Sequence, residues 1–350
     1  ATIFKGRRQS TAHCYLEPAK TRPNLTILTD AVGLSLSFKG KRCTGVRFLK
    51  EGQTIEKLAF REVILSSGSI NSPKILELSG IGQPELLAEK GITPFHELPG
   101  VGENLRDHYS PRMRYAIKGR DYTFCERGNG LSLGLEAIKY LFARKGFMAL
   151  STVPLRMYFK TRTGLMTPDA TISFMPYLTE RRKRARVISK RPGLTMSVNV
   201  LRPESRGNIH IKSSSPHDAP HINFNFLSTQ IDTDTLLLAL RKGRELMSTE
   251  PISNYVEEEI APGLELETDE EIITWVRNTA ETTYHPIGTC KMGNDANAVV
   301  GADLKVHGLD GLRVADASIM PTLTSGNTNA PSIMIGEKCS DMLLAAARFN

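Results

Sequence analysis

A histidine near the end of the chain lies where the local sequence would hold an imidazole ring still. His285 is followed directly by Pro286 within residues 283–293, which read TYHPIGTCKMG. Proline restricts the preceding residue to extended backbone conformations, and the nearby glycines would let a flat ligand approach closely. Because an imidazole ordinarily titrates at about pH 6.5, such a histidine could act as a general base. On spacing alone, the pattern favours a histidine whose ring is satisfied by a backbone carbonyl in a tight turn.

A second feature is the start of the last predicted helix. The polar turn SGNTNA (325–330) precedes Pro331, and proline is favoured in the first helical turn. A helix N-terminus presents unpaired N–H groups and partial positive charge, which stabilise an anion or a group that becomes anionic during a reaction. Asn329 lies in this polar segment, so it joins His285 as a candidate site residue. A well-capped helix that only packs on the core would show the same pattern.

Two rival arrangements predict other chemistry. GLSLG at 130–134 fits the G-x-S-x-G turn that presents a nucleophilic serine in hydrolases, with Ser132 as the candidate. That turn needs a buried strand before the serine, whereas the preceding RDYTFCERGN is polar, so we expect Ser132 at the start of a helix instead. His285 and Cys290 could be metal ligands, but zinc needs further ligands in recognisable pairs, and no CxxC accompanies them. We predict no metal site.

The composition excludes some classes of partner. Of 350 residues, 40% are hydrophobic and 23% charged, which is typical of a globular protein. The net charge of +8 is concentrated in ERRKRARVISKR at 180–191, where no aromatic residues are interleaved for stacking on bases. We therefore expect no nucleic-acid partner, and interpret 180–191 as a solvated basic loop or as a peripheral contact with an anionic membrane or an acidic partner.

The spacing of the cysteines indicates the redox environment of the protein. All five are scattered along the chain and none is in CxxC spacing, which favours free thiols in a reducing environment. We expect a cytoplasmic protein, with the inner face of the membrane as an alternative.

The hydrophobic pattern predicts an α/β region, an antiparallel insert and a return to α/β. The first region contains strand-like runs at 24–30, 45–50 and 61–68, followed by a helix in which Ser72 is the N-cap and Pro73 the first residue. Strand-like runs joined by short turns favour an antiparallel sheet in the middle of the chain; they lie at 170–178, 193–201, 207–213 and 221–227. A capping box, Thr268 with Glu271, opens a helix just before His285. The last region contains a strand-like run at 312–321 and the helix expected to begin at Pro331.

Four long stretches resemble the glucose–methanol–choline (GMC) oxidoreductases, and their order along the chain is that of the family. They are REVILSSGSINSPKILELSGIG (61–82), LPGVGENLRDH (98–108), YHPIGTCKMG (284–293) and LRVADASIMPTLTSGNTNAPSIMIGEK (312–338). The resemblance is strongest to the choline dehydrogenase and alcohol dehydrogenase branch. It implies three segments: a partial FAD-binding, Rossmann-like domain (1–108), a substrate-binding domain with an antiparallel sheet (109–275), and a C-terminal return to the FAD-binding domain with the catalytic residues (276–350).

The resemblance also implies the roles of particular residues. His285 would accept the hydroxyl proton of an alcohol, Asn329 would hydrogen-bond the same oxygen, and a hydride would pass to N5 of FAD. The residues expected near FAD are Val32, Gly33, Gly68, Asn104, Asp316, Ala317 and Thr328. His108 lies in the same junction as Asn104, with no role assigned to it.

One expected feature of an FAD-binding domain is missing from the sequence. No G-x-G-x-x-G turn is present, so the chain resembles the C-terminal part of a longer protein, and we expect it to bind FAD weakly or not at all by itself. The expected substrate is choline or, because ISFMPYL (172–178) is apolar, a neutral aliphatic or aromatic alcohol. The electron acceptor would be a quinone, oxygen or another compound. An inactive fragment or structural subunit is a further alternative.

Overall fold

The computed structural model describes residues 2–119, 122–182 and 185–348, and it divides into two compact units. Unit 1 comprises residues 1–25, 109–201 and 230–283; unit 2 comprises residues 26–108, 202–229 and 284–350. Residues 1–25 thus group with the middle of the chain, and residues 202–229 group with the two ends. The three consecutive domains expected from the sequence remain a prediction.

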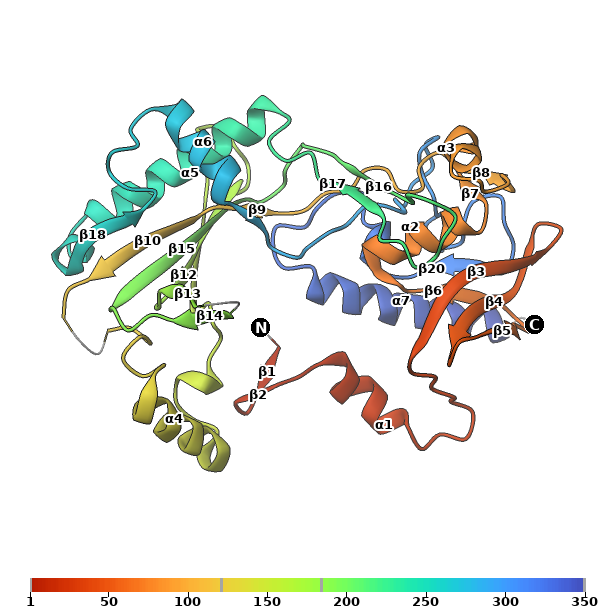
Figure 1. Cartoon of the computed structure of the whole chain (residues 1–350), viewed down its shortest axis with the longest axis horizontal. Helices are drawn as coiled ribbons and strands as arrows, with labels where there is room; N and C mark the ends of the chain where they lie inside the picture. Colours follow the sequence, from red (N-terminus) through yellow and green to blue (C-terminus); the bar gives the residue numbers. More distant parts are fainter. Residues whose placement is uncertain (1, 120–121, 183–184, 349–350) are drawn as a thin grey trace. The chain divides into compact units, whose positions relative to one another are not determined.

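Unit 1 is built on an antiparallel sheet of five strands in the order β11-β12-β15-β10-β18 (Figure 1). The strands are β10 (Arg112–Ile117), β11 (Leu155–Phe159), β12 (Ala170–Met175), β15 (Gly193–Val200) and β18 (Val256–Ala261). Helix α5 (Gln230–Ser248) packs on β12 and β15, where Leu236 and Leu240 are buried. The helix α6 (Asp269–Thr279) begins at the predicted capping box, in which both reciprocal hydrogen bonds between Thr268 and Glu271 are present.

Smaller elements complete unit 1. Helix α4 (Gly130–Ala143) is followed by the 3-10 turn η2 (Phe147–Ala149), and β9 (Tyr109–Ser110) pairs with β19 (Glu281–Thr282). The hairpin β13 (Thr179–Arg182) and β14 (Ala185–Ile188) forms a sheet of its own. The N-terminal stretch contributes β1 (Ile3–Phe4), β2 (Arg7–Arg8), the π-helical turn η1 (Ala12–Leu16) and α1 (Glu17–Ala19), and η3 (Ile252–Tyr255) precedes β18.

Unit 2 combines α/β elements with a three-stranded meander. Strand β6 (Val63–Leu65) pairs in parallel with β20 (Leu312–Val314), and α2 (Gly68–Leu78) follows β6. The meander consists of β3 (Ala31–Lys39), β4 (Arg42–Lys50) and β5 (Gln53–Leu58). The remaining elements are β7 (Ile81–Gly82), α3 (Pro84–Glu89), β8 (His96–Glu97), β16 (Asn208–His210), β17 (His221–Asn223), η4 (Ala317–Ile319) and α7 (Asn329–Arg348). The core of unit 2 gathers around Leu65, Leu76, Ile81, Leu312 and Val314.

Several predicted boundaries are wrong, for identifiable reasons. No strand forms at 24–30. The turn between Lys39 and Arg42 sets the pairing of β3 with β4, in which Ala31 lies opposite Lys50, the last residue of β4. Residues before Ala31 therefore have no part of β4 to pair with. The runs 207–213 and 221–227 form the two-stranded sheet β16-β17 in unit 2, and they do not join the five-stranded sheet. Helix α7 begins at Asn329, two residues before the predicted start.

Helix α2 also begins earlier than predicted, and Ser72 is not its N-cap. The helix starts at Gly68 after the N-cap Ser67, so Pro73 lies inside it. A proline has no N–H to offer the carbonyl four residues earlier, which here is that of Ser69. That carbonyl instead accepts a hydrogen bond of 2.7 Å from the Thr289 hydroxyl. The interior proline thereby ties α2 to the loop that carries His285.

Candidate active site

The loop from His285 to Cys290 is fixed on two sides within unit 2. Ile287 and Arg106 exchange backbone hydrogen bonds of 2.9 and 3.1 Å. On the other side, the Ser69 hydroxyl donates to the Pro286 carbonyl at 2.7 Å, which complements the bond from Thr289 to Ser69. This part of the chain is therefore a rigid platform rather than a free loop.

Gly288 is required where the loop passes Asn104. Its φ of +93° lies in the region that favours glycine, and a Cβ there would come within 2.3 Å of the Asn104 carbonyl oxygen. The Asn104 side chain donates to the carbonyls of Gly288 and Pro321, at 3.4 and 3.3 Å. Asn104, which the sequence placed near the cofactor, thus joins the His285 loop to the segment before α7.

The His285 residue is held by three other residues of unit 2. Its ring nitrogen Nδ1 lies 3.0 Å from Nδ1 of His108, and the two rings are nearly perpendicular, at 88°. Its backbone N–H donates to Asp107 Oδ1 at 3.0 Å. The third neighbour is Asn327, whose amide nitrogen lies 2.8 Å from His285 Nε2. The alternative in which a backbone carbonyl alone satisfies the ring does not describe this arrangement.

The network assigns a tautomer to the neutral His285 ring. With the Asn327 amide donating to Nε2, the ring proton is on Nδ1, where it is donated to Nδ1 of His108. The Nε2 atom is then the basic nitrogen and points toward Asn327. Since His108 and Asp107 are buried, with 4% and 2% of their surface exposed, the orientation of His285 is set from within the protein.

The structure joins Asn327, not the expected Asn329, to His285. Asn329 is the exposed first residue of α7, and Thr328, which precedes it, is buried. The motif SGNTNA offers two asparagines, and the sequence does not say which of them reaches the histidine. The site therefore includes Asn327 and Asp107, which sequence reasoning missed.

Three residues expected near FAD do meet, where β6 and β20 end. Asp316 Oδ2 accepts hydrogen bonds from the Gly68 N–H at 3.0 Å and from the Ser72 hydroxyl at 2.6 Å, while Oδ1 accepts from Ser318 N at 2.8 Å. Ala317 follows Asp316 and pairs with the His285 loop through a bond from Gly288 N to its carbonyl, at 3.4 Å. Gly68, Asp316 and Ala317 thus adjoin the His285 platform.

Val32 and Gly33 lie on β3, which packs against α2. Val32 is half exposed on β3, and a Cβ at Gly33 would lie 3.3 Å from Cδ1 of Ile75. Ile75 is seven residues after Gly68, or about 10 Å along the helix axis. Gly33 therefore adjoins α2 about two turns after Gly68, at a distance from the His285 network.

The arrangement fits one part of a dinucleotide cofactor and not another. The carboxyl ends of parallel strands are the usual place for such cofactors, and Gly68, with φ +79°, has open space where a Cβ would be. However, the N-terminus of α2 is already neutralised by the carboxylate of Asp316, so it is not available to a phosphate. Gly68 and Asp316 therefore leave room for a cofactor beside the His285 platform, whereas the N-terminus of α2 does not serve as a pyrophosphate cradle.

The rival readings find little support in the structure. Ser132 lies in the first turn of α4, and the residues before it form bends and turns rather than a buried strand. Burial raises the pKa of the Cys290 thiol well above its usual range, which keeps it protonated and unsuited to metal binding. Within the described ranges, no group of three or more His, Cys, Asp or Glu side chains could hold a metal ion.

The basic stretch at 180–191 is only partly described, because residues 183–184 lie outside the described ranges. Arg191 forms ion pairs with Glu257 at 3.4 Å and with Glu258 at 3.0 Å, so part of the positive charge is balanced within the protein. Among the described helices, none is both long enough and apolar enough to cross a bilayer.

Comparison with known proteins identifies relatives along most of the chain. Two sequence profiles described as GMC oxidoreductase match, the N-terminal one over residues 3–110 and the C-terminal one over residues 203–336. The oxygen-dependent choline dehydrogenase of Escherichia coli is 44% identical over 342 residues, which are 97% of this chain and 60% of that protein. The oxygen-dependent choline dehydrogenase of Shigella flexneri is 43% identical over 343 residues, which cover 61% of its length. The chain spans about three fifths of the length of these curated relatives.

Solved structures show the same fold. Formate oxidase of Aspergillus oryzae superposes with a TM-score of 0.89 at 26% identity, over 99% of this chain and 65% of that one. Pyridoxine 4-oxidase from Mesorbium loti gives a TM-score of 0.83 at 26% identity, over 97% of this chain and 62% of that one.

Proposed function

Because this chain belongs to the GMC oxidoreductase family, we propose that it carries the catalytic residues of an FAD-dependent enzyme that oxidises an alcohol to an aldehyde. The observation that carries the proposal is the fixed ring of His285, whose basic Nε2 atom lies 2.8 Å from the Asn327 amide. Removal of a hydroxyl proton requires a base. A neutral hydrogen-bond donor beside that base stabilises the negative charge that develops on the oxygen.

His285 is the base in this proposal. Its Nε2 takes the hydroxyl proton of the alcohol, and the resulting imidazolium shares the proton on Nδ1 with the buried His108. Bound FAD supplies the redox chemistry, as acceptor of the hydride that leaves the carbinol carbon. Asp107 holds the backbone of His285, so the ring keeps its place while its charge changes.

Asn327 takes the role that the sequence suggested for Asn329. Its amide, next to Nε2, can donate to the alcohol oxygen and stabilise the charge that develops there. The N-terminus of α7, which begins two residues later, adds partial positive charge to the same place. Asn329 remains the alternative, and the two residues are separable by mutation.

FAD is proposed to contact Gly68, Asp316, Ala317 and Thr328, with Asn104 beside them and with Val32 and Gly33 toward the adenosine. Asp316 and Gly68 support this through their shared hydrogen bond at the carboxyl ends of β6 and β20. The phosphates are proposed to be held by sequence other than this chain, in keeping with the 60% of the choline dehydrogenase that the chain spans.

Choline is the first substrate to test, because the curated relatives are choline dehydrogenases. Neutral aliphatic and aromatic alcohols come second, because the run at 172–178 is apolar. The proposed acceptor is oxygen or a quinone. A cytoplasmic location, with contact at the inner face of the membrane through 180–191, is proposed on the five free cysteines and the basic charge.

The proposal is tested on FAD-loaded protein by visible absorption under anaerobic conditions. Addition of choline, or of a neutral alcohol, should bleach the flavin band, and readmitted oxygen or an added quinone should restore it. A retained flavin that no alcohol bleaches would contradict the proposed activity.

A further inference from the structure

His210 lies between two carboxylates in unit 2. Its ring nitrogen Nδ1 is 2.6 Å from Glu77 Oε1, and its Nε2 is 3.1 Å from Glu103 Oε1. The side chain of Glu77 is 1% exposed and that of His210 is 12% exposed, so water and salt screen this contact little. A neutral imidazole has one donor nitrogen and one acceptor nitrogen, whereas both nitrogens of an imidazolium are donors. The geometry therefore favours the protonated form of His210.

The titration of the cluster agrees with this geometry. Burial lowers the pKa of His210, but its hydrogen bonds to Glu103 and Glu77 outweigh this effect and raise the pKa to about 9. The hydrogen bond from His210 also holds the pKa of Glu103 below its usual range. Loss of the proton would leave a lone pair of the ring facing a carboxylate. Glu77 is the more buried carboxylate and accepts a further hydrogen bond of 2.8 Å from the Ile211 N–H, so the contact with Glu103 is the one that opens.

The other charged groups near His210 are directed elsewhere. Lys74 on α2 donates to two backbone carbonyls of the connection between β16 and β17, at 2.7 and 2.8 Å. His221 lies opposite His210 on β17 and is exposed, and Lys212, two residues further along the chain, is exposed as well. The two carboxylates are therefore the charges that His210 balances.

The segment of residues 102–108 passes directly beside the His210 ring. A Cβ at Gly102 would lie 2.8 Å from Nδ1 of His210, so a glycine is needed for the backbone to come this close. Further along the segment, Leu105 and Gly207 exchange backbone hydrogen bonds of 2.9 and 2.8 Å. One edge of the segment is thus fixed to the strand β16 and the residues just before it.

The other edge of the segment 102–108 holds the proposed base. Arg106 pairs through its backbone with the loop that carries His285. Asp107 accepts the backbone N–H of His285, and His108 contacts its ring. A loosening at the start of this segment would therefore reach the base through a short run of backbone.

We propose that the His210 imidazolium is a positioning residue for His285: it keeps the segment 102–108 in place, and loss of its proton releases Glu103 and slows the reaction. This inference rests on the proposed role of His285 as the base. The base must itself be unprotonated to act, so activity first rises with pH and then falls when His210 loses its proton.

The pH profile of anaerobic flavin reduction by alcohol tests the proposal on FAD-loaded protein. The unchanged protein should reduce its flavin severalfold more slowly at about pH 10 than at about pH 8, because the proton of His210 is lost near pH 9. His210→Gln should already be severalfold slower at about pH 8 and should show no further fall. An alkaline fall of the same size in His210→Gln would overturn the proposal.

Glu103→Gln separates the charge from the contact. The glutamine amide can accept a hydrogen bond from the protonated His210 ring through its oxygen, and it can donate one to the neutral ring through its nitrogen. This variant should therefore keep the rate of the unchanged protein at about pH 8 and lose the fall at higher pH. A fall that persists in Glu103→Gln would overturn the proposed release of Glu103.

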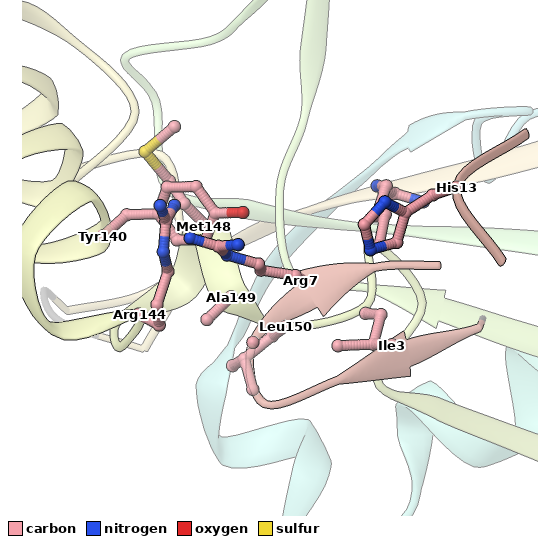
Figure 2. A pocket seen from close by; sticks show the side chains of 10 residues that line it. Ile3, Arg7, His13, Tyr140, Arg144, Met148, Ala149 and Leu150 are labelled. Carbon is pink, nitrogen blue, oxygen red and sulfur yellow. The ribbon is translucent and has the colours of Figure 1, made fainter. Parts of the chain in front are cut away.

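Two other histidines provide matched controls. His13 is exposed and lines a cavity of about 440 Å³ in unit 1, together with Arg7 and Tyr140 (Figure 2). His13→Gln and His221→Gln should both keep the rate at about pH 8 and the alkaline fall. Loss of the fall in His221→Gln would assign the titration to β17 and would overturn the role of His210.

Hydrogen–deuterium exchange at about pH 7.5 provides a readout that does not depend on activity. Peptides that cover residues 102–108 should exchange severalfold faster in His210→Gln than in the unchanged protein, whereas peptides from β10 and β15 should not change. Unchanged exchange in 102–108 would overturn the positioning role. Absence of flavin reduction by alcohol in the unchanged protein would instead contradict the proposed function, and exchange would still decide whether His210 holds the segment.

Discussion

The side-chain amide of Asn327 lies 2.8 Å from Nε2 of His285, although the two residues are 42 positions apart in the sequence. One residue comes from the turn before α7 and the other from the loop that is tied to α2. In the proposed mechanism, the alcohol loses its proton where these two side chains meet.

The first prediction separates the two asparagines of the SGNTNA turn. Asn327→Ala should lower kcat by about a hundredfold, since it removes a donor next to the reacting oxygen. Asn329→Ala should leave kcat unchanged, because Asn329 is the exposed first residue of α7 and Asn327 is the one at His285. Steady-state oxidation of the best alcohol measures both. A large loss in Asn329→Ala with little in Asn327→Ala would restore the assignment made from the sequence.

His108 should act as a positioning residue for His285. His108→Ala removes the partner of His285 Nδ1 and should lower kcat by about tenfold to a hundredfold, with flavin content retained. His108→Asn, whose amide can occupy the place of Nδ1, should recover most of the loss. Failure of the asparagine to do better than alanine would indicate that His108 serves only to fill space.

Asp316 should contribute to stability as well as to the cofactor site. Asp316→Ala would leave the Gly68 N–H, the Ser72 hydroxyl and the Ser318 N–H without their common acceptor. We expect the free energy of unfolding to fall by about 1–3 kcal/mol. Asp310→Ala, at an exposed aspartate of the same unit, is the control and should change it by less than about 0.5 kcal/mol. Equal melting temperatures for both variants would contradict the role of Asp316.

The charged cluster around His210 should make stability depend on pH. Burial lowers the pKa of His210, but hydrogen bonds to Glu103 at 3.1 Å and Glu77 at 2.6 Å outweigh it and raise the pKa to about 9. A histidine whose pKa is higher in the folded state stabilises the fold fully below its unfolded pKa of about 6.5. This contribution, at most on the order of 3 kcal/mol, is lost as the pH rises from about 6.5 through 9.

Thermal melting across that pH interval measures the effect. The unchanged protein should lose stability as the pH rises, and His210→Gln should show a flatter profile from a lower starting point. Parallel profiles for the two proteins would show that His210 does not titrate in this range.

The sequence predicted the fold where local signals and tertiary packing agree. Thr268 and Glu271 specify the start of α6 by themselves, because a capping box is satisfied within one turn. The start of α2 could not be read in this way, since Ser72 and Pro73 are good local signals for an N-terminus. The observed start at Gly68 depends on Asp316 and Thr289, more than 200 residues away in the sequence, which satisfy the first turn and the carbonyl that Pro73 frees.

For the candidate site, too, the sequence identified residues with a local signal and missed those that depend on tertiary contacts. His285 was identifiable because its constraint, Pro286, is adjacent in sequence. Asn327 and Asn329 were not separable, because α7 begins two residues earlier than Pro331 indicated and the turn that presents Asn327 is shaped by that start. Asp107 carried no local signal, and only the pairing of Arg106 with Ile287 brings it under His285.

The most direct test of the central claim is the anaerobic rate of flavin reduction by alcohol in His285→Ala, compared with the unchanged protein. We predict that the substitution slows reduction by about a thousandfold or more, while the flavin stays bound, because the base is removed and the cofactor contacts remain. Reduction at an unchanged rate would show that His285 is not the base and would contradict the proposed mechanism.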